Sequence, residues 1–394
     1  MNLTMQRSGA SRRARSLVIA ALAGVAALTA IAAPPADAKK KKPKGPTVTV
    51  MTRNMFLGAD LGPGLDAGDL NEAIDGAGVI LNELDSTKIE ERVVPMAKEI
   101  KESKADLVGL QEVALWHDQT PSDFGAPPTG FGSEATNVRY DFLQLLLDEL
   151  ERIGGKYDVV AVQDEFEAEL PANTDGSADH SAELDGRLKM RDVILARQGS
   201  KVKLGKVESA NFTEANLFTP TIAGLIELPV QRGWISVEGK VQGGSGKASA
   251  SKSKDYKFRF VNTHLEAFGE PTIREAQARE LFAKGGPLKT GKQVILVGDI
   301  NSGGPKDNIT GDDPLAYDAL IDFGMKNLGT RHTCCYSSLF DPDAPIDHTV
   351  DHVMAKPGLK QKDAFLTGDD PAERTPSGLA PSDHLGVVSK LVLK

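Results

Sequence analysis

One segment of the sequence, residues 294–302, reads Val294-Ile295-Leu296-Val297-Gly298-Asp299-Ile300-Asn301-Ser302. Its four consecutive apolar residues, mostly β-branched, are typical of a strand that is buried on both faces. A glycine follows, where the backbone can turn sharply. Because residues two apart on an extended chain point the same way, Asp299 and Asn301 should share one face at the mouth of the strand. Such a pair could bind a hard cation or orient a water molecule, although an ordinary Asx turn would look the same.

Polar side chains also lie at the ends of other predicted strands. We expect these strands over residues 47–52, 106–110, 256–263, 294–297, 350–354 and 385–393. The polar residues at or beside their ends are Asn54, Glu112, His264, Asp299, Asn301, Asp351, Asp383 and His384. Each of them alone is equally compatible with a structural role. Together they supply carboxylates, imidazoles and carboxamides, a set that suits a hard divalent ion and a phosphate ester.

The rest of the chain mixes helical and strand patterns. Apolar spacing predicts helices over residues 87–100, 137–153, 274–284 and 314–323, the first opened by a Thr87-x-x-Glu90 capping box. Residues 231–237 and 256–263 should form a hairpin with a Gly/Ser/Lys-rich tip at residues 243–253. Residues 164–189 are expected to be an irregular surface excursion, and a strand over residues 192–196 should pair with residues 202–209. This mixture predicts mixed rather than purely parallel sheets.

The first 38 of the 394 residues have the pattern of a secretory signal peptide. Arg12, Arg13 and Arg15 form a positive region before an apolar, alanine-rich run over residues 17–33, and Ala36-Asp37-Ala38 fits a cleavage site. A membrane anchor is the alternative, but the run is short and is followed by Pro34-Pro35. We therefore expect a secreted, extracellular protein with a basic disordered tail at residues 39–46. No integral membrane segment is expected after cleavage, and export by the general or the twin-arginine route stays open.

Charge and cysteine content narrow the class of protein further. The net charge of −9 at pH 7 gives no global basic field that would attract nucleic acid. The two cysteines, Cys334 and Cys335, are neighbours, and a bond between neighbours closes too small a ring to staple a core. Their redox state stays open. No Cys/His spacing suggests structural zinc.

Six short motifs occur in a fixed order: Arg53-Asn54-Met55, Leu110-Gln111-Glu112-Val113, Asn262-Thr263-His264-Leu265-Glu266, Val297-Gly298-Asp299-Ile300-Asn301, Val350-Asp351-His352-Val353 and Ser382-Asp383-His384. The series resembles the endonuclease/exonuclease/phosphatase superfamily, which includes DNase I. The resemblance spans residues 48–393 and implies that residues 47–394 form the catalytic domain. It also implies an α/β fold, a four-layer α/β/β/α sandwich with two mixed β-sheets packed face to face between outer helices. The strand ends would then converge on one cleft.

The resemblance implies a metal site among these residues. Glu112 matches the metal-binding glutamate, Asn54 would help to hold the ion or the phosphate, and Asp383 would be a further ligand. Mg²⁺ prefers one or two carboxylates together with water and phosphate oxygens, which fits this set. We therefore expect Mg²⁺ as the cofactor, with Mn²⁺ or Ca²⁺ as alternatives.

The resemblance also implies catalytic roles. Asp299 would orient or deprotonate the attacking water with Asn301 as its companion, and His264 would stabilise charge or protonate the leaving group. His384 would contact the scissile phosphate, and Asp351 would orient His384. Asp347 competes with Asp351 for this role, and we favour Asp351 because the residues after it continue as a strand. Substrate binding would involve Asn54, Asn301 and His384.

These observations predict a secreted, divalent-metal-dependent phosphoesterase that hydrolyses phosphodiester bonds, with a nuclease-type activity in first place. A sphingomyelinase- or phospholipase C-like enzyme is the alternative, as is a non-catalytic surface or binding protein on the same scaffold. The expected partner is a phosphodiester, either nucleic acid or a phospholipid head group, and no protein partner is predicted. A nuclease needs cations for the flanking phosphates, and the candidates are Arg53, Arg191, Arg232 and Arg274.

Overall fold

The computed structural model describes residues 45–125, 134–243, 254–304, 313–341, 343–356 and 358–394. These described residues belong to one compact unit. The predicted signal peptide lies outside the described residues, as do most of the predicted tail and nearly all of the hairpin tip at residues 243–253. Among the helices that are described, none combines the length and the apolar character needed to cross a membrane.

The first sheet contains the N-terminal and C-terminal strands of the domain. Its strands follow the order β15-β16-β1-β2-β6-β3-β4, and β5 pairs with β6. Strands β1 and β2 are parallel, whereas the other pairs are antiparallel. Their bounds are β1 Thr47–Asn54, β2 Leu107–Gln111, β3 Leu115–Gln119, β4 Asn137–Asp141, β5 Tyr157–Ala172, β6 Leu184–Arg197, β15 Lys360–Thr367 and β16 Gly386–Val392.

The second sheet contains the segment with which the sequence analysis began. Its order is β13-β14-β12-β11-β10-β7, with β11 and β12 parallel and the other pairs antiparallel. The bounds are β7 Lys203–Asn211, β10 Gly233–Gln242, β11 Asp255–His264, β12 Gln293–Asp299, β13 Lys326–Asn327 and β14 Asp351–Ala355. A separate short ribbon joins β8 Thr221–Ile222 to β9 Ile226–Glu227.

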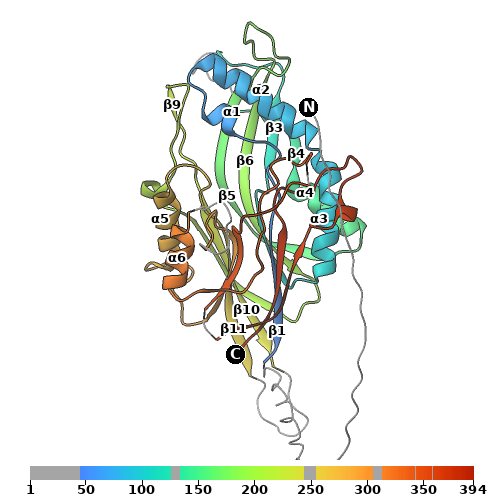
Figure 1. Cartoon of the computed structure of the whole chain (residues 1–394), viewed down its shortest axis with the longest axis vertical. Helices are drawn as coiled ribbons and strands as arrows, with labels where there is room; N and C mark the ends of the chain where they lie inside the picture. The colour runs from blue at the N-terminus through green and yellow to red at the C-terminus, as the bar shows by residue number, and fades with distance from the viewer. Residues whose placement is uncertain (1–44, 126–133, 244–253, 305–312, 342, 357) are drawn as a thin grey trace, which may run out of the picture. The chain divides into compact units, whose positions relative to one another are not determined.

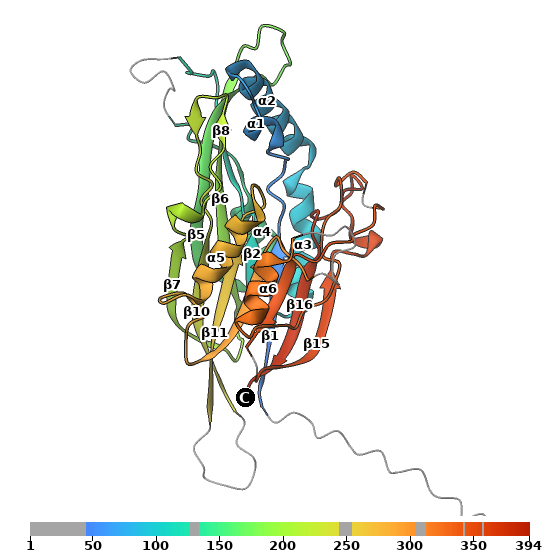
Figure 2. The same cartoon turned by 60° about the vertical axis from the view of Figure 1, so that its left-hand side comes forward.

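Helices cover the outer face of each sheet (Figures 1 and 2). Helices α2, α3 and α4 share a buried apolar cluster with the first sheet, and α5 and α6 share another with the second. The helices are α1 Gly62–Leu65, α2 Leu70–Ser86, α3 Ile89–Ser103, α4 Phe142–Arg152, α5 Pro271–Phe282 and α6 Leu315–Asp322, with 3₁₀ turns at Glu214–Asn216 and Pro371–Glu373.

A third apolar cluster fills the space between the two sheets. Alternate residues of β12 belong to two different apolar clusters, one on each face of the sheet. Ile295 and Val297 join the cluster between the sheets, whereas Val294 and Leu296 pack toward α5 and α6. Such alternation, with a period of two residues, is expected for a strand that is buried on both faces. The predicted four-layer α/β/β/α sandwich with mixed sheets is therefore confirmed.

Two predictions for residues 164–209 are wrong. Residues 164–189, expected to be irregular, belong mostly to the long antiparallel strands β5 and β6. The segment after β6, β7, does not pair with it but with β10 in the other sheet. The expected hairpin between β10 and β11 is present. Polar residues on the partly exposed face of β5 conceal the strand pattern in the sequence.

The predicted helices differ from the observed ones mainly at their N-termini. Residues 137–141 form β4, and the helix begins only at Phe142, where the carboxylate of Asp141 accepts hydrogen bonds from two backbone amides. Helix α3 begins at Ile89, and Thr87 does not cap it, since its hydroxyl donates to Gly58 O. Helix α2 and strand β15 had no counterpart in the sequence prediction.

Candidate active site

The register of the strands brings the polar strand ends together. In the second sheet, His264 at the end of β11 lies opposite Asp299, and Asp299 lies opposite Asp351 at the start of β14. In the first sheet, Asn54 at the end of β1 pairs with Gln111, the residue before Glu112. The carboxyl ends of parallel strands meet at the same edge of a sheet, so local sequence and topology together build the site.

Asn54 connects the two sheets at this edge. Its Nδ2 donates to Glu112 Oε1 over 2.9 Å and lies 3.1 Å from Asp299 Oδ2. The second oxygen of Glu112 accepts the amide of Leu57 at 2.8 Å. Glu112 has a φ of 55°, in the left-handed region, so the backbone turns sharply as β2 ends. Two carboxylates from different sheets are thus held beside one carboxamide.

His384 lies among carboxylates. Its Nδ1 is 2.8 Å from Asp351 Oδ2, and its Nε2 is 3.7 Å from Asp299 Oδ2 and 4.0 Å from Asp383 Oδ1. Burial opposes protonation of the ring, but the three carboxylates prevail and raise the pKa of His384 well above its ordinary value. Arg53 donates to the carbonyl of His384, which fixes the backbone at this point. His384 is therefore set up to carry a proton.

His264 has the opposite electrostatic surroundings. Its Nδ1 is 3.2 Å from Nη1 of Arg232, and its Nε2 is 3.1 Å from Nδ2 of Asn301. Burial, the Arg232 guanidinium and His384 together lower the pKa of His264 well below its ordinary value. The imidazole of His264 is therefore neutral near neutral pH.

Asp299 lies between the two histidines. Its Oδ1 accepts the backbone amide of Asn301 at 2.9 Å, and Asn301 adopts a left-handed φ of 46° to make this turn. Burial raises the pKa of Asp299 to about 7, although His384 opposes the shift. A carboxylate with this pKa can accept a proton from water near neutral pH. The chain is therefore not extended beyond Asp299 as expected but forms an Asx turn, and this turn places Asn301 beside Asp299.

The site also offers oxygen ligands for a divalent ion. Glu112 and Asp383 line the same cavity, and Asn54 is bonded to Glu112. Burial raises the pKa of Asp383. Asp351 Oδ1 is buried and has no hydrogen-bond partner in the part of the chain that the structure describes. Ligand atoms of Asp299, Asp351 and His384 also lie within 4.8 Å of one another. This set of hard oxygen donors fits Mg²⁺, Mn²⁺ or Ca²⁺.

The eight residues singled out in the sequence are therefore all brought together by direct contacts or at one cavity: Asn54, Glu112, His264, Asp299, Asn301, Asp351, Asp383 and His384. Asp347 is not part of this group, since its carboxylate faces its own neighbour His348 at 2.9 Å. Of the two competing aspartates, Asp351 is the one beside His384. The neighbours Cys334 and Cys335 are disulfide-bonded and lie against His384, with Cys334 Sγ 3.5 Å from Nε2.

Sequence reasoning missed a buried acidic cluster behind His264. Glu165, Glu266 and Asp192 surround Arg232, whose guanidinium is 3.7 Å from Glu165 and 3.6 Å from Glu266. Burial raises the pKa of Glu165 to about 8 and that of Asp192 well above its ordinary value. These residues come from β5, from β6, from the position just before β10 and from the loop after β11, and no local sequence signal connects them.

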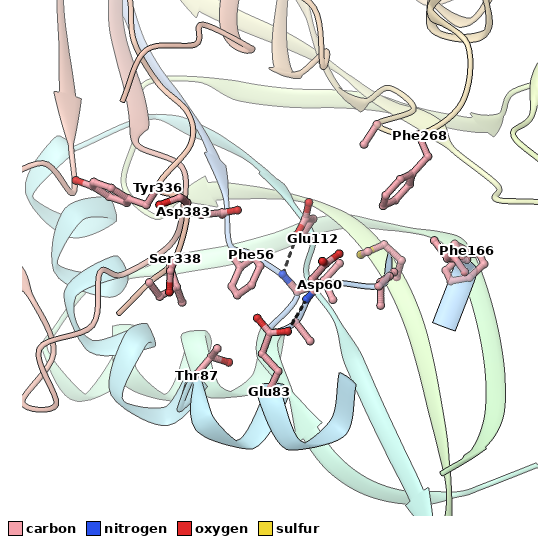
Figure 3. A pocket seen from close by; sticks show the side chains of 18 of the residues that line it. Phe56, Asp60, Glu83, Thr87, Glu112, Phe166, Phe268, Tyr336, Ser338 and Asp383 are labelled. Carbon is pink, nitrogen blue, oxygen red and sulfur yellow. Dashed lines mark hydrogen bonds between the residues drawn. The ribbon is translucent and has the colours of Figure 1, made fainter. Parts of the chain in front are cut away.

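A cavity of about 340 Å³ opens beside Glu112 and Asp383. Figure 3 shows Phe56 and Glu112 near its centre, with Tyr336 on one side and Phe166 and Phe268 on the other. Its volume is within the range of ligand pockets. Two polar residues of the site, Glu112 and Asp383, thus lie at the wall of a cavity whose other walls are largely apolar.

Several solved structures are similar to this chain. The solved structures that this chain resembles include an endonuclease/exonuclease/phosphatase family protein from Bacteroides thetaiotaomicron, 17% identical, with 89% of this chain and 100% of that chain covered and a TM-score of 0.48. A mannosyl-6-phosphatase from Bacteroides thetaiotaomicron is 17% identical over 88% of this chain and 99% of its own, with a TM-score of 0.48. TDP2 from D. rerio, complexed with a single-strand DNA product, is 13% identical over 88% and 98%, with a TM-score of 0.46.

No curated protein matches the sequence. The model of the Endonuclease/Exonuclease/phosphatase family matches residues 90–384, which include seven of the eight residues at the strand ends. The remaining residue, Asn54, precedes the match but is bonded to two residues within it. The chain belongs to the endonuclease/exonuclease/phosphatase family, whose members hydrolyse phosphate esters.

Proposed function

We propose that this protein is a secreted, divalent-metal-dependent phosphodiesterase. The observation that carries the proposal is the position of Asp299, which lies between a histidine held protonated and a carboxamide bonded to Glu112. Hydrolysis of a phosphodiester needs a base for water, positive charge for the phosphate and a proton for the leaving group. Glu112, Asn54 and Asp383 would hold the metal, which neutralises charge on the phosphate when bound.

The protein's own residues supply the other requirements. Asp299, with a pKa of about 7, accepts a proton from the attacking water. Protonated His384 donates to a non-bridging phosphate oxygen, and Asp351 holds its ring in place. Asn301 positions neutral His264 on the other side of Asp299. There the ring would donate a hydrogen bond to the phosphate, and the proton that Asp299 takes from water would pass to the leaving-group oxygen. The two histidines therefore act on the same phosphate, His384 as a protonated imidazole and His264 as a neutral one.

Nuclease-type activity is one candidate for the substrate class, supported by the order of the sequence motifs. The four arginines expected to hold flanking phosphates have other partners, however. Arg53 bonds Glu99, Arg191 bonds Asp141, Arg232 lies between Glu165 and Glu266, and Arg274 bonds Asp313. A phospholipid head group, which needs no row of cations, is the second candidate. Secretion is supported by the signal-peptide pattern of residues 1–38.

The test is turnover of bis(p-nitrophenyl) phosphate, plasmid DNA, RNA and a phospholipid, each with and without EDTA. We expect hydrolysis of at least one diester that stops with EDTA and returns with Mg²⁺ or Mn²⁺. Asp299→Asn should lower the rate by roughly a hundredfold or more, because it removes the base. Absence of turnover with every diester and metal would point instead to a binding protein on this scaffold.

A further inference from the structure

The cavity beside Glu112 and Asp383 has an aromatic wall that the proposed chemistry does not use. Five aromatic side chains come from four separate parts of the chain: Phe56, Phe166, Phe268, Tyr336 and Phe340. Aliphatic side chains of the loop after β1 and of β6 complete the lining, among them Leu57, Leu61 and Met190. Phe340 is 60% exposed, so the aromatic wall extends to the mouth of the cavity.

This wall is held in place by contacts behind it. Phe56 follows β1 with a left-handed φ of 57°, and the guanidinium of Arg92 lies 5.4 Å from the centre of its ring. Arg92 is buried and donates to the carbonyls of Met55 and Phe56. On the opposite side, the ring of Phe268 lies 6.0 Å from that of Phe218. A preformed apolar surface costs a ligand little reorganisation.

The charges at the cavity are mainly negative. Besides Glu112 and Asp383, it is lined by Asp60 and Glu83, which Figure 3 shows close together below Glu112. A 3.0 Å hydrogen bond from the Asp60 amide joins the two. Arg232 is the one basic side chain among the lining residues that the structure describes, and it already faces two buried glutamates. A second phosphate in this cavity would meet repulsion and no counter-charge.

We propose, resting on the phosphodiesterase function above, that this cavity binds the organic group esterified to the scissile phosphate. That group is an uncharged aryl group or alkyl chain that carries no second phosphate. The reacting phosphate would lie at Glu112, Asp299 and His384, and its substituent would extend along Phe56 and Phe268. A second apolar cavity shares Leu61, Leu65 and Phe166 with the first and lies against α2, in the direction that a longer chain would follow.

Phosphonates with one substituent test this assignment, because their single organic group has one place to bind. Affinities of methyl-, phenyl-, octyl- and 2-carboxyethylphosphonate are measured by calorimetry with the full-length protein and Mg²⁺. We expect phenyl- or octylphosphonate to bind at least about tenfold more tightly than methylphosphonate, from burial of apolar surface. The carboxylate compound should bind more weakly than methylphosphonate. A preference for octyl indicates a lipid-like chain, and a preference for phenyl indicates an aryl ester.

Variants test whether the difference in phosphonate affinity arises in this cavity. Phe268→Ala should reduce the advantage of the preferred apolar phosphonate at least threefold and leave methylphosphonate unchanged. Asp60→Asn should improve binding of 2-carboxyethylphosphonate. Phe365→Ala is the matched control, since Phe365 is an exposed phenylalanine of β15 that does not line the cavity, and it should change nothing.

Two results would overturn the assignment. One is equal affinity for methyl-, phenyl- and octylphosphonate, and the other is tighter binding of an oligothymidylate than of any apolar phosphonate. Failure of the underlying phosphodiesterase function is a different result, in which methylphosphonate does not bind with Mg²⁺ and no diester is hydrolysed. That result would remove both proposals.

Discussion

Replacing Asp351 by Asn tests the electrostatic basis of the site most directly, because it keeps the shape and removes the charge. Asp351 Oδ2 is 2.8 Å from His384 Nδ1, and both side chains are almost completely buried. At an effective dielectric constant of about 20, unit charges at this distance attract by on the order of 6 kcal/mol. Desolvation offsets much of this, so we expect about 2–3 kcal/mol of transition-state stabilisation to be lost, roughly 30- to 150-fold in kcat.

The pH dependence of kcat gives an independent reading of the same change. In the parent protein the carboxylates raise the pKa of His384 well above its ordinary value, so the proton stays on the ring into the alkaline range. Asp351→Asn lowers that pKa, and activity should therefore fall at a lower pH on the alkaline side. The assay is the pH profile of bis(p-nitrophenyl) phosphate hydrolysis at saturating Mg²⁺. The melting temperature should change by only a few degrees, because Asn fills the same space.

Asp347→Asn is the matched control, because Asp347 contacts its neighbour His348 rather than His384 and its side chain is 26% exposed. We expect its kcat to stay within about threefold of the parent value. Equal losses in the two variants would refute the pairing of Asp351 with His384. If the alkaline side of the pH profile of kcat does not move in Asp351→Asn, the claim that this carboxylate keeps His384 protonated is refuted.

Four further predictions follow from the same contacts. Glu112→Gln should need more Mg²⁺ for half-maximal activity without loss of fold, measured by metal titration and circular dichroism; an unchanged requirement would exclude Glu112 as a ligand. His264→Ala and His384→Ala should each lose roughly a hundredfold in kcat, and the double variant far less than their product, because residues that act as a unit are not additive. Burial raises the pKa of Glu165 from 4.5 to about 8, so the folded protein holds a proton that the unfolded chain releases. The free energy of unfolding should therefore fall as pH rises from about 4.5 to about 8, and Glu165→Gln should flatten this slope in denaturant titrations. Secreted protein should begin at Lys39, which N-terminal sequencing checks; an intact leader on exported protein would contradict this.

The parts of the site that could be predicted are those encoded within single strands. The apolar run of β12 is followed by Gly298, whose φ of 150° brings its Cα against the Thr263 carbonyl, where a side chain would clash. The polar residue after it is then at the sheet edge whatever the neighbouring strands are. The sequence alone can therefore assign such residues to one edge of the sheet, without knowledge of which strands pair or in which register.

Helix α2 shows what local patterns cannot supply. Half of its buried residues are alanine or glycine, and Gly76 and Gly78 stand where a Cβ would overlap the carbonyls of Pro63 and Asn173. Glycines in a helix lower its intrinsic propensity by about 1 kcal/mol each relative to alanine. The close approach that justifies them depends on segments distant in sequence, so the helix could not be recognised from its own residues.

The two histidines show the same limit at the level of chemistry. Each follows a β-branched or acidic residue at a strand end, and nothing in the local sequence distinguishes their charges. His264 is next to the guanidinium of Arg232, the residue before β10, whereas His384 is surrounded by carboxylates of β12, β14 and its own loop. Burial and the Arg232 guanidinium lower the pKa of His264, whereas the carboxylates outweigh burial and raise the pKa of His384. The division of labour between a neutral and a protonated imidazole is therefore a property of sheet pairing, and a chain that kept both histidines but lost Arg232 would have a differently charged site.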